Sequence, residues 1–272
     1  MERPVLIVGA FDDLRHRDVK LIDEASQLGP VTVLLLTDQA IERATNKTPK
    51  FPWLERLYLM QAVRFVSRVV PLNALNSPQV LSATADTRPQ LWLDCEGPEN
   101  EPRRQLSIES GLEYRVISLS QPGGSPEPSI SAPRSKRKKV IVTGCYDWLH
   151  SGHVRFFEEV SAYGDLYVIV GHDANIRLLK GEGHPLVPQE ERRYMAGAIR
   201  YVTQALVSTG NGWLDAEPEI QRLKPDIYAV NEDGDRGGKR EYCSRMGLQY
   251  LVLKRVPAPG LPPRSSTELR GF

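Results

Sequence analysis

The second half of the chain alternates between short apolar runs and segments in which apolar residues recur at helical spacing. The apolar runs predict buried strands, and the helical spacing predicts helices between them. The predicted strands are 140–143, 166–170, 205–208, 227–230 and 250–253. The predicted helices are 154–162, 190–202, 217–223 and 239–246. Strands that alternate with helices indicate a parallel sheet with helices on both faces.

An internal repeat extends this pattern to the first half of the chain. Residues 9–14 (GAFDDL) match residues 144–149 (GCYDWL), and weaker matches continue in the same order with one gap. A repeat this long indicates two whole domains rather than a solenoid. We therefore predict an α/β fold with two tandem Rossmann-like, doubly wound parallel sheets. The expected boundaries are a first domain at 1–119, a Pro/Gly/Ser-rich linker at 120–137 and a second domain at 138–272.

Composition and charge narrow the class of protein. A net charge of +1 gives no overall attraction to nucleic acid or to membranes. We interpret the basic residues at 134–139 as a solvated approach to a strand rather than a nucleic-acid site. No apolar run is long enough to span a bilayer, and three scattered cysteines favour free thiols in a reducing compartment. We therefore expect a cytoplasmic protein with no membrane span and no nucleic-acid partner.

The segment after the first strand of the second domain carries the candidate chemistry. That strand ends at Gly144, a short loop follows, and His150-Ser151-Gly152-His153 opens a predicted helix. Glycines let the backbone approach a ligand closely, and a helix N-terminus offers free N–H groups and a positive dipole end that suit phosphate. Two imidazoles there can donate hydrogen bonds to phosphate oxygens. The alternative, two surface histidines at a helix start, does not account for the strand and loop before them.

These residues resemble the nucleotidyltransferases that carry an H-x-G-H motif, especially the cytidylyltransferase-like branch. The resemblance continues in family order at Lys180, at Glu191-Arg192 and at the closing segment Ser265-Ser266-Thr267. Two such domains in one chain resemble the arrangement of ethanolamine-phosphate cytidylyltransferases. The glycine-rich segment that begins at Lys180 also resembles the adenylyltransferase half of heptose-phosphate enzymes, so the resemblance leaves the nucleotide base open.

The resemblance implies attack by a substrate phosphate oxygen on the α-phosphorus of a nucleoside triphosphate, with release of pyrophosphate. It assigns catalytic roles to His150 and His153, with charge assistance if they are protonated, and to Arg255. Lys180, expected in a flexible glycine-rich loop, would act as a mobile point charge. The implied nucleotide-binding residues are Gly144, Cys145, Tyr146, Asp147, Gly152, Asn231, Asp233, Arg264, Ser265, Ser266 and Thr267. Mg²⁺ is expected to accompany the triphosphate, with few protein ligands.

The expected partners are a nucleoside triphosphate and a small phosphorylated substrate. The resemblance favours transfer of CMP from CTP to a small phosphomonoester. The alternatives are an adenylyltransferase that acts on a sugar phosphate or FMN, and a non-catalytic nucleotide sensor. Residues 257–263 lengthen the spacing between Arg255 and the closing segment, so Arg264 is an alternative to Arg255. We expect His172 and His184 to be loop residues rather than ligands.

The first copy of the repeat lacks the candidate chemistry. Arg15 and Asp18 replace the two histidines, Arg17 replaces the glycine between them, and Thr45 replaces the lysine. An aspartate there would repel phosphate, so we predict a catalytically inactive duplicate. We expect it to pair with the second copy as a pseudo-dimer, with further oligomers open. The alternative is a regulatory site that binds an anion through Arg15 and Arg17.

Overall fold

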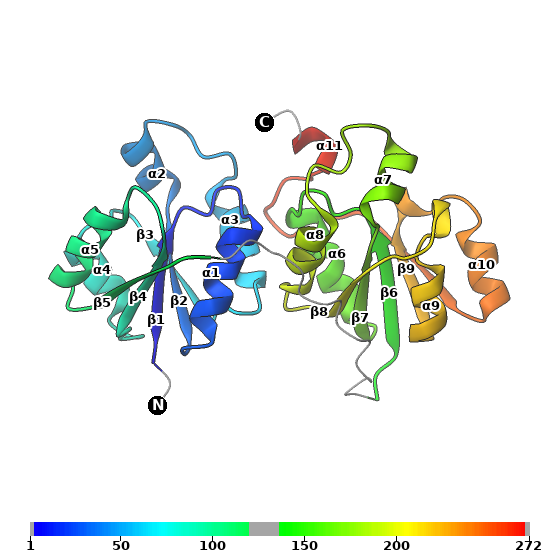
Figure 1. The fold of residues 1–272 in the computed structure, drawn as a ribbon, viewed down its shortest axis with the longest axis horizontal. Helices are drawn as coiled ribbons and strands as arrows, with labels where there is room; N and C mark the ends of the chain where they lie inside the picture. Colours follow the sequence, from blue (N-terminus) through cyan, green and yellow to red (C-terminus); the bar gives the residue numbers. More distant parts are fainter. Residues whose placement is uncertain (1–2, 120–135, 270–272) are drawn as a thin grey trace. The chain divides into compact units, whose positions relative to one another are not determined.

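Two five-stranded parallel sheets form the framework of the protein, one in each half of the chain (Figure 1). The computed structural model describes residues 3–119 and 136–269. Contacts between residues divide the chain into two units, 1–121 and 122–272. The linker that we expect at 120–137 lies almost entirely outside the described residues.

The first unit alternates strands and helices along its whole length. Its strands are β1 (Val5–Gly9), β2 (Val31–Leu36), β3 (Arg68–Leu72), β4 (Leu91–Cys95) and β5 (Glu113–Ile117). Its helices are α1 (His16–Ser26), α2 (Asp38–Thr45), α3 (Trp53–Ala62), α4 (Ser77–Thr84) and α5 (Asn100–Glu109). The strand order across the sheet is β3-β2-β1-β4-β5.

The second unit repeats this succession and adds a few short elements. Its strands are β6 (Lys139–Gly144), β7 (Asp165–Val170), β8 (Val202–Val207), β9 (Ile227–Asn231) and β10 (Gln249–Leu253). Its helices are α6 (Ser151–Ser161), α7 (Asp173–Lys180), α8 (Gln189–Gly197), α9 (Glu217–Leu223), α10 (Lys239–Met246) and α11 (Ser266–Leu269). Two 3-10 turns, η1 (Gly212–Leu214) and η2 (Glu232–Gly234), complete it.

The two sheets have the same topology, which confirms the predicted α/β fold with two Rossmann-like domains. In the second unit the order is β10-β9-β6-β7-β8, so the first strand lies between the second and the fourth, as in the first unit. Val140 of β6 lies opposite Leu166 of β7 on one side and opposite Ile227 of β9 on the other. The order reverses between β6 and β9, and a crevice at such a switch point, beyond the strand ends, is where ligands bind in open α/β sheets.

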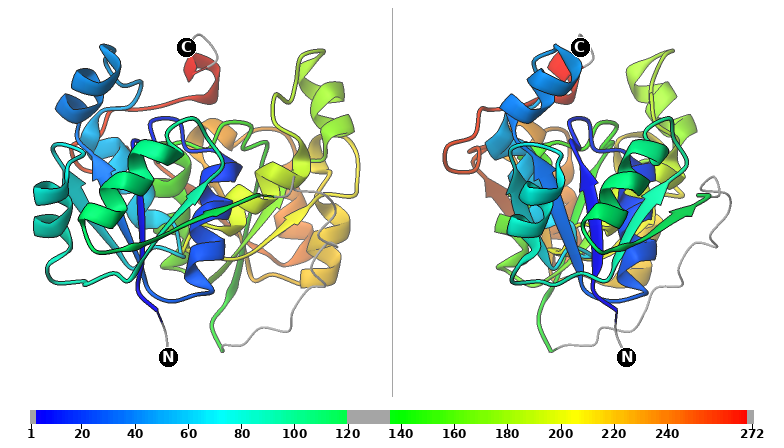
Figure 2. Two further views of the ribbon diagram at one scale, coloured as in Figure 1. Left: turned by 60° about the vertical axis from the view of Figure 1, so that its left-hand side comes forward. Right: turned by 90° about the vertical axis from the view of Figure 1, so that its left-hand side faces the viewer.

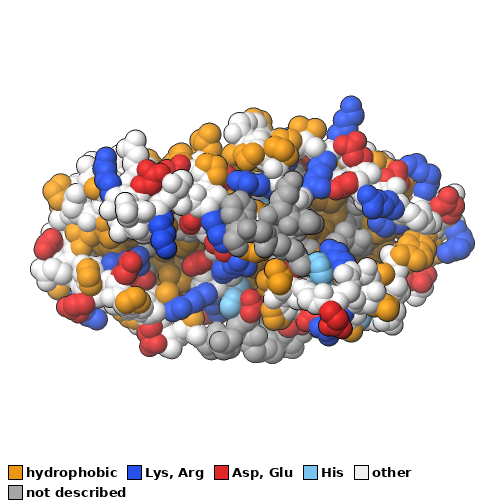
Figure 3. All heavy atoms as spheres, turned by 90° about the horizontal axis from the view of Figure 1, so that it is seen from above, with side chains coloured by type: hydrophobic (Ala, Val, Ile, Leu, Met, Phe, Trp, Pro, Cys, Tyr) orange, Lys and Arg blue, Asp and Glu red, His pale blue; other side chains and the backbone are white. Residues whose placement is uncertain are grey.

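Helices cover both faces of the second sheet, with α6 and α8 on one face and α9 and α10 on the other (Figure 1; Figure 2 gives two further views), which explains its nearly continuous apolar strands. Ile141, Tyr167 and Tyr228 pack in one buried cluster with Ile220 of α9 and Tyr242 of α10. Helices α6 and α8 pack against strands β7 and β8. The sheet is therefore a buried scaffold, and its loops at the strand ends are left to hold the site. Figure 3 looks onto that end of the strands, where Lys, Arg and His side chains reach the surface.

Three local predictions differ from the structure. The helix predicted at 190–202 ends at Gly197, because β8 already begins at Val202 and pairs there with Leu166 of β7. Helix α7 was not predicted at all. Lys180 therefore does not lie in a flexible loop: it is the last residue of α7, and Gly181, at a φ of +86°, ends the helix.

Candidate active site

A cavity of about 230 Å³ opens beyond the ends of β6 and β9, in the second unit. Because these strands are neighbours, their carboxyl ends bring two distant loops together. Twelve residues that the sequence singled out line this one cavity. They are Gly144, Cys145, Tyr146, Asp147, His150, Gly152, His153, Lys180, Asn231, Asp233, Arg255 and Ser266.

The loop after β6 needs its glycine for a steric reason. A Cβ atom on Gly144 would lie 2.8 Å from the Tyr146 ring, which folds back over it with a φ of +52°. The first unit builds the same turn, since a Cβ on Gly9 would lie 2.8 Å from the ring of Phe11, whose φ is +47°. The Gly-x-aromatic pair therefore shapes the loop in both copies, whether or not a catalytic residue follows.

The two histidines lie on top of one another at the start of α6. Their ring centroids are 3.9 Å apart and the rings are nearly parallel. His150 caps the helix, because its Nδ1 accepts a hydrogen bond of 3.1 Å from the Gly152 N–H. The Nε2 of His150 and the Nδ1 of His153 are buried and have no hydrogen-bond partner among the described residues. These two nitrogens therefore have unused hydrogen-bonding capacity.

Both imidazoles are held neutral near pH 7. Burial, followed by repulsion from His153 and Arg255, lowers the pKa of His150 far below its usual value. Burial, with the positive charges of Arg255 and Lys180, lowers the pKa of His153 to about 3. The condition for charge assistance, a protonated imidazole, is therefore not met in the ligand-free site. A neutral imidazole still has one N–H to donate and one nitrogen to accept.

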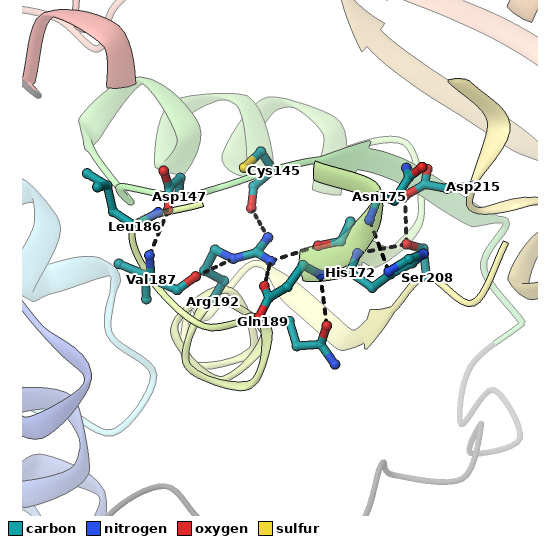
Figure 4. A network of polar contacts seen from close by, with 12 residues as sticks. Cys145, Asp147, His172, Asn175, Leu186, Val187, Gln189, Arg192, Ser208 and Asp215 are labelled. Carbon is teal, nitrogen blue, oxygen red and sulfur yellow. Dashed lines mark hydrogen bonds and ion pairs between the residues drawn. The ribbon is translucent and has the colours of Figure 1, made fainter. Parts of the chain in front are cut away.

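Asp147 and the buried Arg192 fix the loops around the cavity (Figure 4). The Oδ1 of Asp147 accepts hydrogen bonds from the backbone N–H groups of Leu186, at 2.7 Å, and Val187, at 2.9 Å. Arg192, 1% exposed, donates to the backbone oxygen of Cys145 at 2.6 Å and to Oδ1 of Asp173, at the start of α7, at 2.6 Å. Asp147, which we expect to bind nucleotide, lines the cavity and also has one carboxylate oxygen that positions the neighbouring loop.

The sequence contained a signal for Arg192 in the repeat, where Arg56 occupies the matching position. Arg56 is also 1% exposed, donates to the Ala10 backbone oxygen at 2.7 Å and pairs with Asp38 at 2.6 Å. Asp12 likewise accepts two backbone N–H bonds in the first unit, as Asp147 does in the second. Because the first copy, which lacks the two histidines, keeps these residues, their contacts serve the fold of the loops.

Arg255 and the closing segment form the far wall of the cavity. Arg255 makes an ion pair with Asp233, and its Nη2 donates to the Arg264 backbone oxygen at 2.6 Å. Arg264 does not line the main cavity; it lines a second one of about 70 Å³, which Arg255 also borders.

The last residues of the predicted site are Ser265, Ser266 and Thr267, at the start of α11. Ser266 lines the main cavity, and its Oγ donates to the Trp148 backbone oxygen at 3.4 Å. Ser265 precedes α11, and its backbone oxygen accepts from the Leu269 N–H at 3.2 Å. Ser265 is not among the residues that line either cavity, and the Thr267 side chain lies outside what the structure describes.

Several lining residues were missed by the sequence analysis. They are Thr143, Phe156, His184, Ala229, Val230, Gly234 and Lys239. His184 was expected to be only a loop residue, yet it reaches the cavity; His172 instead caps α7. Burial lowers the pKa of Lys239, whose Nζ donates to the Gly234 backbone oxygen at 2.9 Å. Nothing in the sequence marked these residues, because only the tertiary packing brings them to the strand ends.

Cys145 lines the cavity without the properties of a nucleophile. Burial raises the pKa of its thiol, which outweighs the opposite influence of Lys180. A thiol of raised pKa is poorly ionised at neutral pH and reacts slowly. The structure thus favours a packing role for this side chain in the loop.

The matching residues of the first unit bond to one another. Arg15 pairs with Asp13 at 2.6 Å, and its backbone N–H donates to Asp18 at 2.9 Å, which closes a capping box at α1. Arg17 donates to the Glu96 backbone oxygen at 2.7 Å. With the two arginines engaged in this way, the first unit offers less to an anion than its sequence suggests.

Two further findings concern metals and membranes. Within residues 3–119 and 136–269, no three His, Cys, Asp or Glu side chains come close enough to form a metal-binding group. Over the same residues, every helix is too short or too polar to cross a bilayer.

The site and its sheet place the chain in a known family. The cytidylyltransferase-like family matches residues 141–272, which contain the whole cavity. The chain belongs to this family of nucleotidyltransferases, and it is an enzyme of that class.

Individual relatives each match less than half of this chain. The FAD synthase of Ferroglobus placidus is 35% identical over 120 residues, which are 43% of this chain and 75% of that protein. The FAD synthase of Pyrococcus horikoshii is 41% identical over 126 residues, 44% of this chain and 82% of that protein. The bifunctional protein HldE of Geobacter sulfurreducens is 41% identical over 106 residues, 38% of this chain but only 21% of that longer protein.

Proposed function

We propose that the second unit transfers AMP from ATP to FMN, forming FAD and releasing pyrophosphate. The observation that carries this proposal is the similarity of the chain to proteins named FAD synthase, which extends over most of their length. The sequence favoured CTP as donor, with ATP and FMN as an alternative. The relatives support the alternative better, and the retention of His150, His153 and Lys180 around one cavity argues against a nucleotide sensor without catalysis.

The chemistry asks little of a general base. An oxygen of the FMN phosphate forms a bond to the α-phosphorus of ATP while the bond from that phosphorus to the bridging oxygen breaks, and pyrophosphate leaves with the electron pair. A phosphate nucleophile is already anionic near neutral pH. The barrier lies in bringing anions together and in stabilising charge on the transferring group, so positioning and electrostatic stabilisation dominate.

The lining residues divide this work by their geometry. His150 and His153 would offer their unpartnered nitrogens to the triphosphate as hydrogen-bond donors. Lys180, exposed at the end of α7, would bring a positive charge to the reacting phosphates. Arg255, held by Asp233, would bind from the opposite wall. The backbone of the loop after β6, shaped by Gly144 and Tyr146, would surround the α-phosphate.

We also propose that Mg²⁺ accompanies ATP. The donor set around the cavity fits this only in part, since Asp147 accepts two backbone N–H bonds and Asp233 pairs with Arg255. The buried Oδ1 of Asn231, which has no hydrogen-bond partner among the described residues, is one neutral oxygen that could approach the ion. The ion would thus be held mainly by triphosphate oxygens and would supply charge neutralisation.

A direct assay tests the proposal. The full chain is incubated with Mg²⁺ and either ATP or CTP, together with FMN, a heptose phosphate or ethanolamine phosphate, and both pyrophosphate and the nucleotidyl product are measured. We expect the protein to form FAD from ATP and FMN and to form little nucleotidyl product from CTP. Turnover of CTP with a phosphomonoester, and none with FMN, would contradict the proposal and support transfer of CMP from CTP, which the sequence motifs favoured.

A further inference from the structure

Trp213 is a large aromatic side chain that the fold leaves 53% exposed. It belongs to the 3-10 turn η1, which follows β8. Its indole ring lies against the backbone of Gly238, where a Cβ atom would be 3.4 Å from the ring. The next residue, Lys239, lines the cavity. Trp213 is not itself among the residues that line the cavity, and its ring lies against the residue that precedes a lining residue.

The turn that carries Trp213 is held rigidly by side chains from elsewhere. Asn175, 1% exposed in α7, makes two hydrogen bonds to Gly212: its amide donates to the backbone oxygen at 3.1 Å and accepts from the N–H at 2.8 Å. Asp215 accepts from the Ser208 hydroxyl at 2.6 Å (Figure 4). A ring presented by so constrained a turn needs little further ordering to bind a ligand.

Helix α7 connects this turn to the positively charged Lys180 side chain of the site. The helix packs against η1 through Asn175, and it ends at Lys180, which lines the cavity. In its last turn, Leu178 and Leu179 are 71% and 54% exposed. Exposed apolar side chains next to a polar cavity mark a binding surface more often than single scattered ones do. One helix thus places apolar surface and a phosphate-binding charge at neighbouring positions.

We infer that Trp213 is the stacking platform for the isoalloxazine ring of the acceptor. This rests on the proposed function. FMN carries a planar aromatic ring system at one end and a phosphate at the other, and this side of the cavity offers an indole ring and Lys180. A sugar phosphate has no planar ring to stack. In the first unit, the segment between β3 and α4 (73–76) contains no aromatic residue, in keeping with the loss of the site there.

The test replaces the ring and separates acceptor binding from catalysis. In Trp213→Leu, the KM for FMN should rise about tenfold, since loss of one aromatic stacking partner has an effect of that order. The kcat and the KM for ATP should change less than about twofold. Trp213→Phe, which keeps an aromatic face, should recover most of the affinity. Tyr163→Leu, which removes another exposed aromatic side chain of the same unit, is the matched control and should behave like the wild type.

A second readout does not depend on turnover. Flavin fluorescence is quenched when the ring stacks on an indole, so titration of FMN with the wild type should quench it and titration with Trp213→Leu should not. If the wild type makes FAD and Trp213→Leu keeps its KM for FMN and its quenching, the platform is refuted and the proposed function stands. If the wild type neither quenches FMN nor makes FAD, the proposed function fails, and the platform fails with it.

Discussion

Acidification should destabilise the second unit through His153, because the fold holds this imidazole neutral. In the unfolded chain its pKa is the ordinary 6.5, whereas burial and the nearby charges of Arg255 and Lys180 lower it to about 3 in the folded protein. Between these two values the unfolded state binds one more proton than the folded state. The stability that the neutral histidine preserves is therefore fully present above pH 6.5 and is lost as the pH falls toward the folded pKa.

The size of the stability loss follows from how far the pH falls below the pKa of the unfolded histidine. One pH unit corresponds to about 1.4 kcal/mol, and at about pH 5 the unfolded histidine has passed its pKa by about 1.5 units. His153 alone should thus remove about 2 kcal/mol of unfolding free energy between about pH 7.5 and pH 5. The pKa of His150 is lowered by burial as well, so it should add to the loss in the same direction.

Urea unfolding of the full chain at the two pH values measures this loss. His153→Gln removes the titrating group, so the second unit of this variant should lose about 2 kcal/mol less than the wild type over the same interval. His16→Gln, at the start of α1 in the first unit, is the control and should leave the loss in the second unit unchanged. Equal losses in the wild type and in His153→Gln would refute the argument that burial keeps this imidazole neutral.

The remaining predictions concern catalysis, the loop network and the duplicate. His153→Ala should lower kcat about 100- to 1000-fold in a pyrophosphate-release assay, whereas Asp18→Ala should leave it nearly unchanged; comparable losses contradict the assignment of catalysis to the second unit. Lys180→Ala should lower kcat strongly with little change in the ATP dissociation constant measured by calorimetry, because its charge is needed most in the transition state; the reverse pattern assigns it to ground-state binding. Arg192→Met should cost about 3 to 5 kcal/mol of unfolding free energy in chemical denaturation, since it removes the buried partner of Asp173 and leaves three backbone carbonyl oxygens without their donor; a loss below about 1 kcal/mol rules out the bracing role. Residues 136–272 expressed alone should aggregate, self-dimerise or melt at lower temperature, by light scattering and thermal denaturation, if the first copy supports the second; a stable, fully active monomer shows that it does not.

The sequence predicted the sheet because the relevant information is local. Apolar runs such as 227–230 and the helices at 217–223 and 239–246 are encoded by the spacing of neighbouring side chains, which does not depend on the rest of the fold. The glycine of the loop after β6 and the two histidines were recognisable for the same reason. Local spacing gave a wrong helix end where a helix and a strand share the same apolar pattern. Val202, predicted as the end of a helix, belongs to strand β8.

The roles of individual atoms were decided only by the tertiary structure. The sequence placed Asp147 with the ligand, yet backbone groups from a loop 40 residues away occupy its Oδ1. It left the charge of the two histidines open, and burial under other elements keeps them neutral. Lys239 and Trp213 reach the cavity or its edge because parallel pairing brings the ends of β8 and β9 to the same side as β6. Pairing between distant strands, solvent exclusion and competition for hydrogen bonds are properties of the packed chain, and no single segment encodes them.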